Sequence, residues 1–491
     1  NKIILIDIGN NIEEALESEN TGGKYMFTFS LDEHKYNHIH LIGIGGISMS
    51  GLAEILISKG YKVSGSDMHA SPTIDRLKSL GADIYIGHHK ENIKDADLVI
   101  YTDAISKDNE ELLEAINKNI ITVNRATFLG ALMNNYNNSI AISGTHGKTT
   151  TTSMIATILN SSDEDPTILL GGLLDDIGGN VKLGSNNILL TEACEYKGNI
   201  TKFFPNIAVI LNMEEEHLDY YKNLDHIVDT FIQYSNNIKT GGYLVINADD
   251  KNAKRVIENT HTNVITFGIK EKADYTAEKI SFDSNGYPTF MLNIKRKFLY
   301  PVKLSVMGFH NVYNALASIA VADILNIPIE TIINSLQRFK GTHRRLELKG
   351  YINGIRIIDD YAHHPTEIKA SLSALRNTTK NKIWCIFQPH TYSRTKMLLD
   401  EFAKSFSKAD KVIVPDIYAA REKDNGIVHS KDLVKALIDN GVDAEYISSF
   451  KNIESYILKN AKKGDVVVTM GAGNVYEIGE NLLDSNKKEA I

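Results

Sequence analysis

A short loop near residue 147 combines glycine, lysine and threonine in an order that suits phosphate binding. The segment GTHGKTT spans residues 144–150, and its two glycines permit backbone amides to approach an anion closely. Lys148 supplies a positive charge for the β- and γ-phosphates, and the hydroxyl of Thr149 or Thr150 can bind Mg²⁺. A strict P-loop has four residues between its glycines and would need glycine where this chain has Ile142. The segment therefore predicts a nucleotide site with a shortened loop, and a plain glycine turn with a surface lysine is the weaker alternative.

Two side chains further along the chain offer ligands for the metal ion that such a loop needs. Glu192 follows the apolar run NNILL, and His217 follows NIAVILNMEEE, so both lie near predicted strand ends. Carboxylates are ordinary magnesium ligands, whereas imidazole is unusual and could act from the outer shell. Either residue alone could be a solvated surface group. Together with the loop, the pattern predicts a Mg²⁺ site that includes Thr149 or Thr150, Glu192 and, in the inner or outer shell, His217.

A second glycine loop lies close to the start of the chain. Gly43-x-Gly45-x-x-Ser48 follows an apolar run, and Asp67 ends the next such run 24 residues after Gly43. This pattern nearly matches a dinucleotide fingerprint, with serine in place of the third glycine. It predicts a diphosphate at a helix N-terminus without specifying nicotinamide, because UDP-sugars carry the same diphosphate. Tight packing between strand and helix is the alternative that needs no ligand.

Polar clusters also follow two apolar runs in the last third of the chain. IIDDYAHHPTE, residues 357–367, places acids, a tyrosine and two histidines after one run, and FQPHTYSRTK places Arg394 after another. An arginine in this position suits a carboxylate or a phosphate. The other histidine pair, His88 and His89, has no such company and is interpreted as structural or solvated.

The elements that must position these residues form three α/β blocks. Apolar β-rich runs alternate with helical segments, a pattern that predicts parallel sheets covered by helices. We expect an extension of unknown role over residues 1–37 and domains over 38–135, 136–340 and 341–491, with a polar linker at 134–139. The first and third domains are expected to be Rossmann-like, and the central domain to be of the P-loop ATPase type.

The central block has a distinct second half. Asn285-Gly286 marks a hairpin turn in a more antiparallel stretch, and residues 310–327 carry apolar positions on a helical repeat. Ligands of open parallel sheets bind beyond the carboxyl ends of the strands. Since the polar clusters lie at such ends, we expect them to line binding sites.

Composition restricts the class of protein. A net charge of −8 argues against a general nucleic-acid binder, and no run of 18 apolar residues predicts a membrane span. The first residues lack the pattern of a secretory signal. Cys194 and Cys385 lie far apart and form no CxxC pair, so a zinc site or disulfide framework is not expected. These features predict a cytoplasmic protein without membrane or nucleic-acid partners. We expect a monomer or weak homodimer, although composition does not determine the oligomeric state.

The ordered motifs resemble those of the Mur ligase family over roughly residues 38–480. They are HLIGIGGISMSG, SGTHGKTTTT, EACEYKGN, NMEEEHLDYY, GFHNVYNALA, FKGTHRRLE, DDYAHHPTE, QPHTYSRT and MGAGN. The resemblance implies an ATP- and Mg²⁺-dependent ligase that forms an amide through an acyl phosphate. The first motif and YAHHPTE favour UDP-N-acetylmuramate and L-alanine as the substrates.

The same resemblance implies roles for individual residues. The residues implied in ATP binding are Gly144, Thr145, His146, Gly147, Lys148, Thr149, Thr150, His310, Asn311, Asn314, Arg345 and Asp360. Those implied in binding the other substrates are Gly43, Gly45, Gly46, Ser48, Ser66, Asp67, Tyr361, His363 and Arg394. The resemblance implies Thr149, Glu192 and His217 as the magnesium ligands. Lys148 is implied in catalysis, and His217 or His363 in orienting or deprotonating the amine, with no choice between the two histidines.

Some residues depart from the family pattern. Ser48 stands where glycine is frequent, Glu216 where aspartate is common, Ala362 where glycine is frequent, and Thr391 where some relatives have a second arginine. None of these removes a group that the chemistry requires. Three alternatives remain at this stage: a sibling ligase that adds another amino acid or a peptide, an NAD-dependent oxidoreductase based on the first loop, and a non-catalytic nucleotide-binding regulator.

Overall fold

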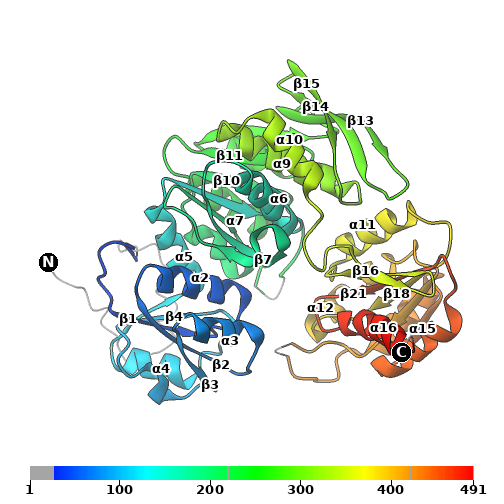
Figure 1. Cartoon of the computed structure of the whole chain (residues 1–491), viewed down its shortest axis with the longest axis horizontal. Coiled ribbons are helices and arrows are strands. Elements are labelled where there is room, and N and C mark those ends of the chain that lie inside the picture. The colour runs from blue at the N-terminus through cyan, green and yellow to red at the C-terminus, as the bar shows by residue number, and fades with distance from the viewer. Residues whose placement is uncertain (1–26, 218–219, 421, 490–491) are drawn as a thin grey trace.

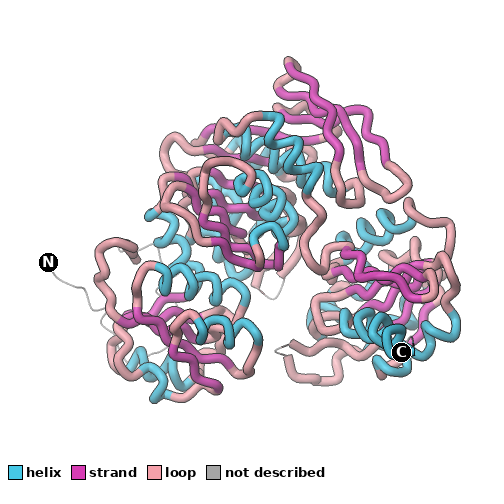
Figure 2. Tube along the Cα trace, viewed as in Figure 1, coloured by secondary structure: helices cyan, strands magenta, loops and turns pink. Residues whose placement is uncertain are grey.

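A computed structural model describes residues 27–217, 220–420 and 422–489, and the expected extension 1–37 lies largely outside them. Three separate sheets follow one another along the chain, each with helices packed on it (Figures 1 and 2). Among the described residues, no helix is both long and apolar enough to cross a membrane. The expected three-part α/β architecture is confirmed.

The first sheet is fully parallel, with the strand order β3-β2-β1-β4-β5. Its central strand is buried along its whole length, as expected for a parallel strand covered on both faces. The strands are β1 (His38–Ile42), β2 (Lys62–Asp67), β3 (Asp83–Ile86), β4 (Leu98–Tyr101) and β5 (Ile121–Asn124). The helices are α2 (Ile47–Ser58), α3 (Pro72–Ser79), η2 (Lys90–Ile93), α4 (Glu110–Asn117), α5 (Arg125–Leu132) and η3 (Met133–Asn135).

The second sheet has ten strands in the order β15-β14-β13-β12-β11-β10-β6-β9-β7-β8. Its strands are β6 (Asn138–Ser143), β7 (Thr167–Leu174), β8 (Gly179–Lys182), β9 (Ile188–Glu192), β10 (Ile207–Ile210), β11 (Tyr243–Asn247), β12 (Asn263–Gly268), β13 (Tyr275–Phe282), β14 (Pro288–Ile294) and β15 (Phe298–Lys303). The helices are α6 (Lys148–Asn160), η4 (Asp175–Ile177), η5 (Tyr196–Lys202), α7 (Leu224–Asn236), α8 (Ala253–Glu258), α9 (His310–Ile324) and α10 (Ile329–Arg338).

Details of the second sheet test two expectations. Strands β13, β14 and β15 are antiparallel, and Gly286, with φ +76°, lies in the turn between the first two, so the expected hairpin is confirmed. The polar stretch 134–139 is a shorter linker than expected. Asn138 and Ser139 already pair with β9 in β6, because their backbone groups complete the sheet despite their polar side chains.

The third sheet has the order β16-β17-β21-β18-β19-β20 and is parallel except for β16. Helix α11 begins with a capping box from His364 and Glu367 and has proline at its first position. The strands are β16 (Glu347–Ile352), β17 (Ile355–Asp360), β18 (Ile383–Phe387), β19 (Lys411–Val414), β20 (Ala444–Tyr446) and β21 (Val466–Met470). The helices are α11 (Pro365–Arg376), α12 (Tyr392–Met397), α13 (Leu399–Ala403), α14 (Ser430–Asp439), α15 (Phe450–Asn460) and α16 (Tyr476–Glu489).

The first two sheets share one hydrophobic core. A single cluster of buried apolar side chains contains Leu41 of β1 together with Ala208 of β10. Backbones also approach closely between the two layers, since a Cβ atom on Gly130 of α5 would lie 2.0 Å from the carbonyl oxygen of Lys202 in η5. The third sheet is enclosed by clusters that draw their buried members from its own strands and helices.

Candidate active site

The shortened phosphate loop connects β6 to α6 and is shaped by its two glycines. Gly144 and Gly147 have φ values of +140° and +84°, which side chains rarely adopt. A Cβ atom on Gly147 would also lie 2.6 Å from Oδ1 of Asn314. Because Gly147 caps α6, the loop presents the amides of the first turn of that helix. The geometry is that of an anion site.

Lys148 is folded back over this loop. Its Nζ donates to the carbonyl oxygens of Gly144 and Thr145 at 2.5 and 3.0 Å, and it lies 3.1 Å from Oε2 of Glu195. Burial alone would lower the pKa of Lys148, but the negative charge of Glu195 reverses this and raises the pKa. The lysine is therefore a fixed positive charge beside the loop.

Glu195 itself is held firmly. Its side chain is almost fully buried, its backbone carbonyl accepts a hydrogen bond from the hydroxyl of Tyr221, and its Oε1 lies 3.6 Å from Nε2 of His217. One carboxylate thus contacts both the lysine and the histidine that sequence analysis singled out.

The expected metal ligands line one cavity of about 600 Å³, together with Lys148. Thr149 donates to Oε2 of Glu192 at 3.0 Å, and the other oxygen of Glu192 accepts from the amide of Gly171 at 2.6 Å. Hydroxyl and carboxylate oxygens are the donors that Mg²⁺ prefers, so this pair fits the ion. Burial, then the charges of Lys148 and Arg394, lower the pKa of His217 to about 3, which leaves its imidazole neutral and able to accept.

A neighbouring cavity of about 540 Å³ extends from the phosphate loop toward α9. Asn311 donates to the carbonyl of Met307 at 2.9 Å, and Asn314 donates to Oδ1 of Asn311 at 2.9 Å, so both amides are fixed in the wall. The expected nucleotide residues that line this cavity are His146, Gly147, Thr150, His310, Asn311, Asn314, Arg345 and Asp360. Apolar side chains, including Leu211 and Phe267, supply part of the remaining wall.

The third domain contributes the opposite wall. The guanidinium of Arg345 lies 5.1 Å from the ring centre of Tyr361 and 3.8 Å from Oε1 of Glu367. Asp360 is buried at the end of β17 and accepts from the amide of Ala362 at 3.0 Å, while its Oδ2 has no hydrogen-bond partner among the described residues. Burial raises the pKa of Asp360 to about 6. An unpartnered carboxylate oxygen beside a nucleotide-sized cavity is available to a ligand hydroxyl.

His363 and Arg394 meet Glu216 of the central domain. Arg394 Nη2 lies 3.5 Å from Oε1 of Glu216, and Nε2 of His363 lies 3.9 Å from the same oxygen. Burial raises the pKa of Glu216 to about 7, and burial lowers the pKa of His363 to about 3. Nδ1 of His363 lies 3.0 Å from the carbonyl oxygen of Tyr361, a contact that holds a proton on Nδ1 and leaves Nε2 as an acceptor.

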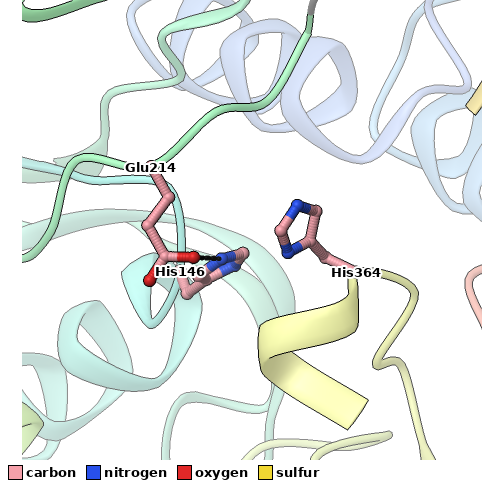
Figure 3. A group of neighbouring side chains, drawn as sticks. All are labelled: His146, Glu214 and His364. Atoms are coloured by element: carbon pink, nitrogen blue, oxygen red, sulfur yellow. Dashed lines mark hydrogen bonds and ion pairs between the residues drawn. The ribbon is translucent and has the colours of Figure 1, made fainter. Parts of the chain in front are cut away.

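His146 of the phosphate loop interacts with Glu214, which follows β10 (Figure 3), and with Glu367 of α11. Its Nε2 lies 3.3 Å from Oε2 of Glu214, and its Nδ1 lies 3.4 Å from Oε1 of Glu367. Burial would lower the pKa of His146, but these two carboxylates raise it to about 10. Thr366 of the third domain donates to Oε2 of Glu214 at 2.6 Å, so the network spans the cleft.

The first glycine loop lies at the end of β1, and its amides are already engaged. The amides of Gly43 and Gly46 donate to backbone carbonyls, and that of Gly45 donates to Oδ2 of Asp67 at 3.0 Å. N–H groups of the first turn of α2 have no intrahelical acceptor, and Ile47 in that turn lines the 600 Å³ cavity. Ser48 accepts from Arg125 at 3.2 Å.

Ser66 is buried below this loop in a polar network. Its hydroxyl donates to Oε2 of Glu111 at 2.5 Å and contacts Nδ1 of His88 at 2.9 Å. Asn92 donates to the other oxygen of Glu111 at 2.5 Å. His88 is thus a structural residue, as interpreted from the sequence, whereas the hydroxyl of Ser66 faces inward to this network.

Sequence reasoning left several site residues without a role. Glu195 lies inside the quoted motif EACEYKGN, Glu214 inside NMEEEHLDYY, and Glu367 inside DDYAHHPTE. The structure brings all three to within 3.5 Å of Lys148 or His146. Their presence within the quoted motifs was the only indication in the sequence. A run of acidic residues does not show which of its side chains points into the site.

The fold and site define a three-domain α/β protein with a phosphate loop in a cleft between its second and third domains. Comparison with known families agrees with this architecture. The description "Mur ligase family, catalytic domain" matches residues 38–137, "Mur ligase middle domain" matches 142–322, and "Mur ligase, glutamate ligase domain" matches 344–473. The chain belongs to the Mur ligase family.

Particular relatives carry a more specific name. UDP-N-acetylmuramate–L-alanine ligase of Acetivibrio thermocellus is 51% identical over 462 residues, covering 94% of this chain and 98% of that protein. The enzyme of the same name from Clostridium acetobutylicum is 52% identical over 456 residues, covering 93% and 99%.

Solved structures agree with these relatives. The crystal structure of UDP-N-acetylmuramate–alanine ligase from Thermotoga maritima is 32% identical, has a TM-score of 0.78, and covers 92% of this chain and 99% of that one. A murein peptide ligase from Psychrobacter arcticus is 26% identical with a TM-score of 0.70, covering 91% and 98%. The oxidoreductase alternative, which rested on the first glycine loop alone, has no support among these proteins.

Proposed function

We propose that this chain is an ATP-dependent ligase that joins L-alanine to the carboxylate of UDP-N-acetylmuramate in peptidoglycan precursor synthesis. The observation that carries the proposal is the shared cavity in which Lys148 and Glu192 of the central domain face Tyr361 and His363 of the third. Relatives that bear this name at 51% and 52% identity support the choice of substrates.

The first chemical step would take place at the phosphate loop. The carboxylate of the sugar substrate attacks the γ-phosphorus of ATP, the bond to the β–γ bridging oxygen breaks, and ADP leaves with that electron pair. Lys148 and the amides of α6 neutralise charge on the phosphates, so catalysis rests on positioning and electrostatics without a protein nucleophile. Thr149 and Glu192 would hold Mg²⁺, which supplies further charge neutralisation to the phosphates.

The second step forms the amide. The amine of L-alanine attacks the acyl phosphate, and phosphate leaves from the tetrahedral intermediate. The amine must lose a proton, and Nε2 of His363 is placed to accept it because the Tyr361 carbonyl holds the ring proton on Nδ1. The lowered pKa of this histidine means that bound substrate charges must first raise its basicity. Arg394, beside it, suits the carboxylate of the amino acid or of the sugar acid.

The remaining site residues take supporting roles in this proposal. Asn311, Asn314 and His310 line the adenine end of the nucleotide cavity, while Arg345 and Asp360 reach the nucleotide from the third domain. Asp67 and the first turn of α2 would hold the uridine diphosphate, with its charge facing the helix N-terminus. Ser66 would support this site from the buried network below the loop.

The test is product formation by the purified chain with ATP, Mg²⁺ and UDP-N-acetylmuramate, offered L-alanine, glycine, L-serine and a murein tripeptide separately. We expect ADP release and a ligated product with L-alanine as the preferred acceptor, and no ADP release without the UDP substrate. Ligation of the tripeptide in place of L-alanine would instead indicate a murein peptide ligase, the activity named for the Psychrobacter relative. Absence of ligation with every acceptor would overturn the proposal.

A further inference from the structure

A group of side chains beside the phosphate loop, separate from Thr149 and Glu192, has the composition of a transition-metal site. His146 of the loop, Glu214 after β10 and His364 at the start of α11 place one ligand atom each within 4.8 Å of one another. Figure 3 shows His364 facing His146 and Glu214 across the domain boundary. Their imidazole rings lie 4.8 Å apart, centre to centre.

The spacing suits a small tetrahedral ion. Ligand atoms at about 2.0–2.1 Å from a tetrahedral zinc lie about 3.4 Å apart. Nε2 of His146 and Oε2 of Glu214 are already separated by 3.3 Å. The ligand atom of His364 lies within 4.8 Å of the other two and must move closer to reach the same centre. Its capping hydrogen bond from the amide of Thr366 is long, at 3.4 Å, and so holds the ring weakly.

A supporting carboxylate stands where metal-binding histidines usually have one. Nδ1 of His146 lies 3.4 Å from Oε1 of Glu367, on the opposite side of the ring from Glu214. Carboxylates in this position orient a histidine ligand and increase its basicity. His364 is 5% exposed, and its Nε2 is buried without a hydrogen-bond partner among the described residues. Within the described residues, the fold therefore leaves Nε2 of His364 available as a ligand.

We propose that His146, Glu214 and His364 bind a divalent transition-metal ion of the Zn²⁺ class, which ties the third domain to the phosphate loop. Two imidazoles and a carboxylate favour such an ion over Mg²⁺, whereas the oxygen donors of Thr149 and Glu192 favour Mg²⁺. The two sites are chemically distinct, and this one goes beyond the proposed ligase activity. Since His146 and Glu214 also line the nucleotide cavity, the fourth ligand position is open to water from that side.

Binding has consequences for protons and for shape. The proton that His146 shares with two carboxylates must leave when the metal binds, so binding releases roughly one proton. Because the ligands come from two domains, the ion holds the cleft closed. Zn²⁺ is accordingly expected to inhibit ligation at saturating Mg²⁺ and to reduce the radius of gyration of the ligand-free chain.

The experiment titrates the metal-stripped full chain with Zn²⁺ against a chromophoric chelator, with millimolar Mg²⁺ present throughout. We expect one tight site, and a loss of affinity of more than about 100-fold in His364→Asn, since even outer-shell changes cost about 10–100-fold. Asparagine keeps a good helix cap, so this variant tests the ligand without removing the cap. Glu214→Gln should weaken binding similarly.

Two controls make the outcome specific. His343→Asn removes another histidine that lies 2.9 Å from each of two carboxylates, on Asp175 and Glu347, and should bind Zn²⁺ as the unmodified chain does. His217→Asn disrupts the other compact group, Glu195, Glu216 and His217, and should also retain the site. Unchanged affinity in His364→Asn, no Zn²⁺ binding by the unmodified chain, or loss of the site in His217→Asn would each overturn the proposal. Ligation measured in Mg²⁺ alone tests the proposed function separately.

Discussion

Oε2 of Glu195 lies 3.1 Å from Nζ of Lys148, so a buried carboxylate holds this lysine in place. The same Nζ also donates to the carbonyl oxygen of Gly144 in the phosphate loop. The glutamate side chain is 3% exposed, and the lysine, which also lines the 600 Å³ cavity, is 16% exposed. The buried carboxylate orients the lysine strongly, because it has little access to water as an alternative partner.

Glu195→Gln should therefore lower kcat about 10–100-fold, because the lysine loses the charge that orients it while the shape of the site is kept. ADP release with saturating substrates is the measurement. Glu215→Gln, an exposed neighbour of the same acidic run, is the matched control and should act like the unmodified enzyme. Equal kcat values for Glu195→Gln and the control would show that this carboxylate does not position the lysine.

Gly147→Ala should abolish nucleotide binding, since the new Cβ would lie 2.6 Å from Asn314 and would also strain the backbone at φ +84°. Gly241→Ala shares the strain, with φ +82°, but its Cβ meets no atom within 4 Å. Both variants should lose about 1 kcal/mol of stability or more, but only the first should lose binding of a fluorescent ATP analogue. Loss of binding in both would point to strain alone.

Asp360→Asn should stabilise the chain while impairing catalysis. The acid's pKa is raised from 3.8 to about 6 by burial, so its ionised form is disfavoured in the folded state. Between about pH 4 and 6, Asp360 is protonated in the folded state but ionised in the unfolded state. The loss of stability caused by burying its charge is therefore absent below this window and complete above it. The variant's gain in unfolding temperature should therefore be full at pH 7–8 and vanish near pH 4. A gain that is independent of pH would contradict this account.

Thr366→Val should open the ligand-free molecule, because the hydroxyl of Thr366 donates to Glu214 at 2.6 Å across the cleft. Loss of one such bond costs about 0.5–1.5 kcal/mol, enough to shift an open–closed equilibrium by roughly 2–10-fold. Small-angle scattering should show a larger radius of gyration than for Thr289→Val, an exposed threonine on β14. ATP analogue and UDP substrate should close both variants, and identical profiles with and without ligands would count against closure.

The sequence predicted those parts of the fold and site that depend on residues close together in the chain. The motif around Lys148 predicted strand, loop and helix correctly, and the motif at 38–67 predicted the βαβ unit with Asp67 at the end of β2. The sequence placed Thr149 after one predicted strand and Glu192 at the end of another, and the structure shows these strands, β6 and β9, to be parallel neighbours.

The contacts across the cleft could not be predicted in the same way. Glu214 and Thr366 lie 152 residues apart, and nothing in either local pattern indicates that they meet. The role of His364 could not be predicted either, because the sequence does not distinguish it from its neighbour His363. In the structure, His364 caps α11, whereas His363 points to Glu216. Such roles depend on how two folded domains face each other.

The hydrophobic cluster shared by the first two sheets has a consequence for how the molecule comes apart. Leu41 and Ala208 belong to one buried apolar cluster, so the first sheet cannot melt without exposing the interior of the second. The third sheet has buried clusters of its own. Calorimetry should accordingly resolve two cooperative transitions for three domains, and the described residues between 27 and 340 should behave as one folding unit.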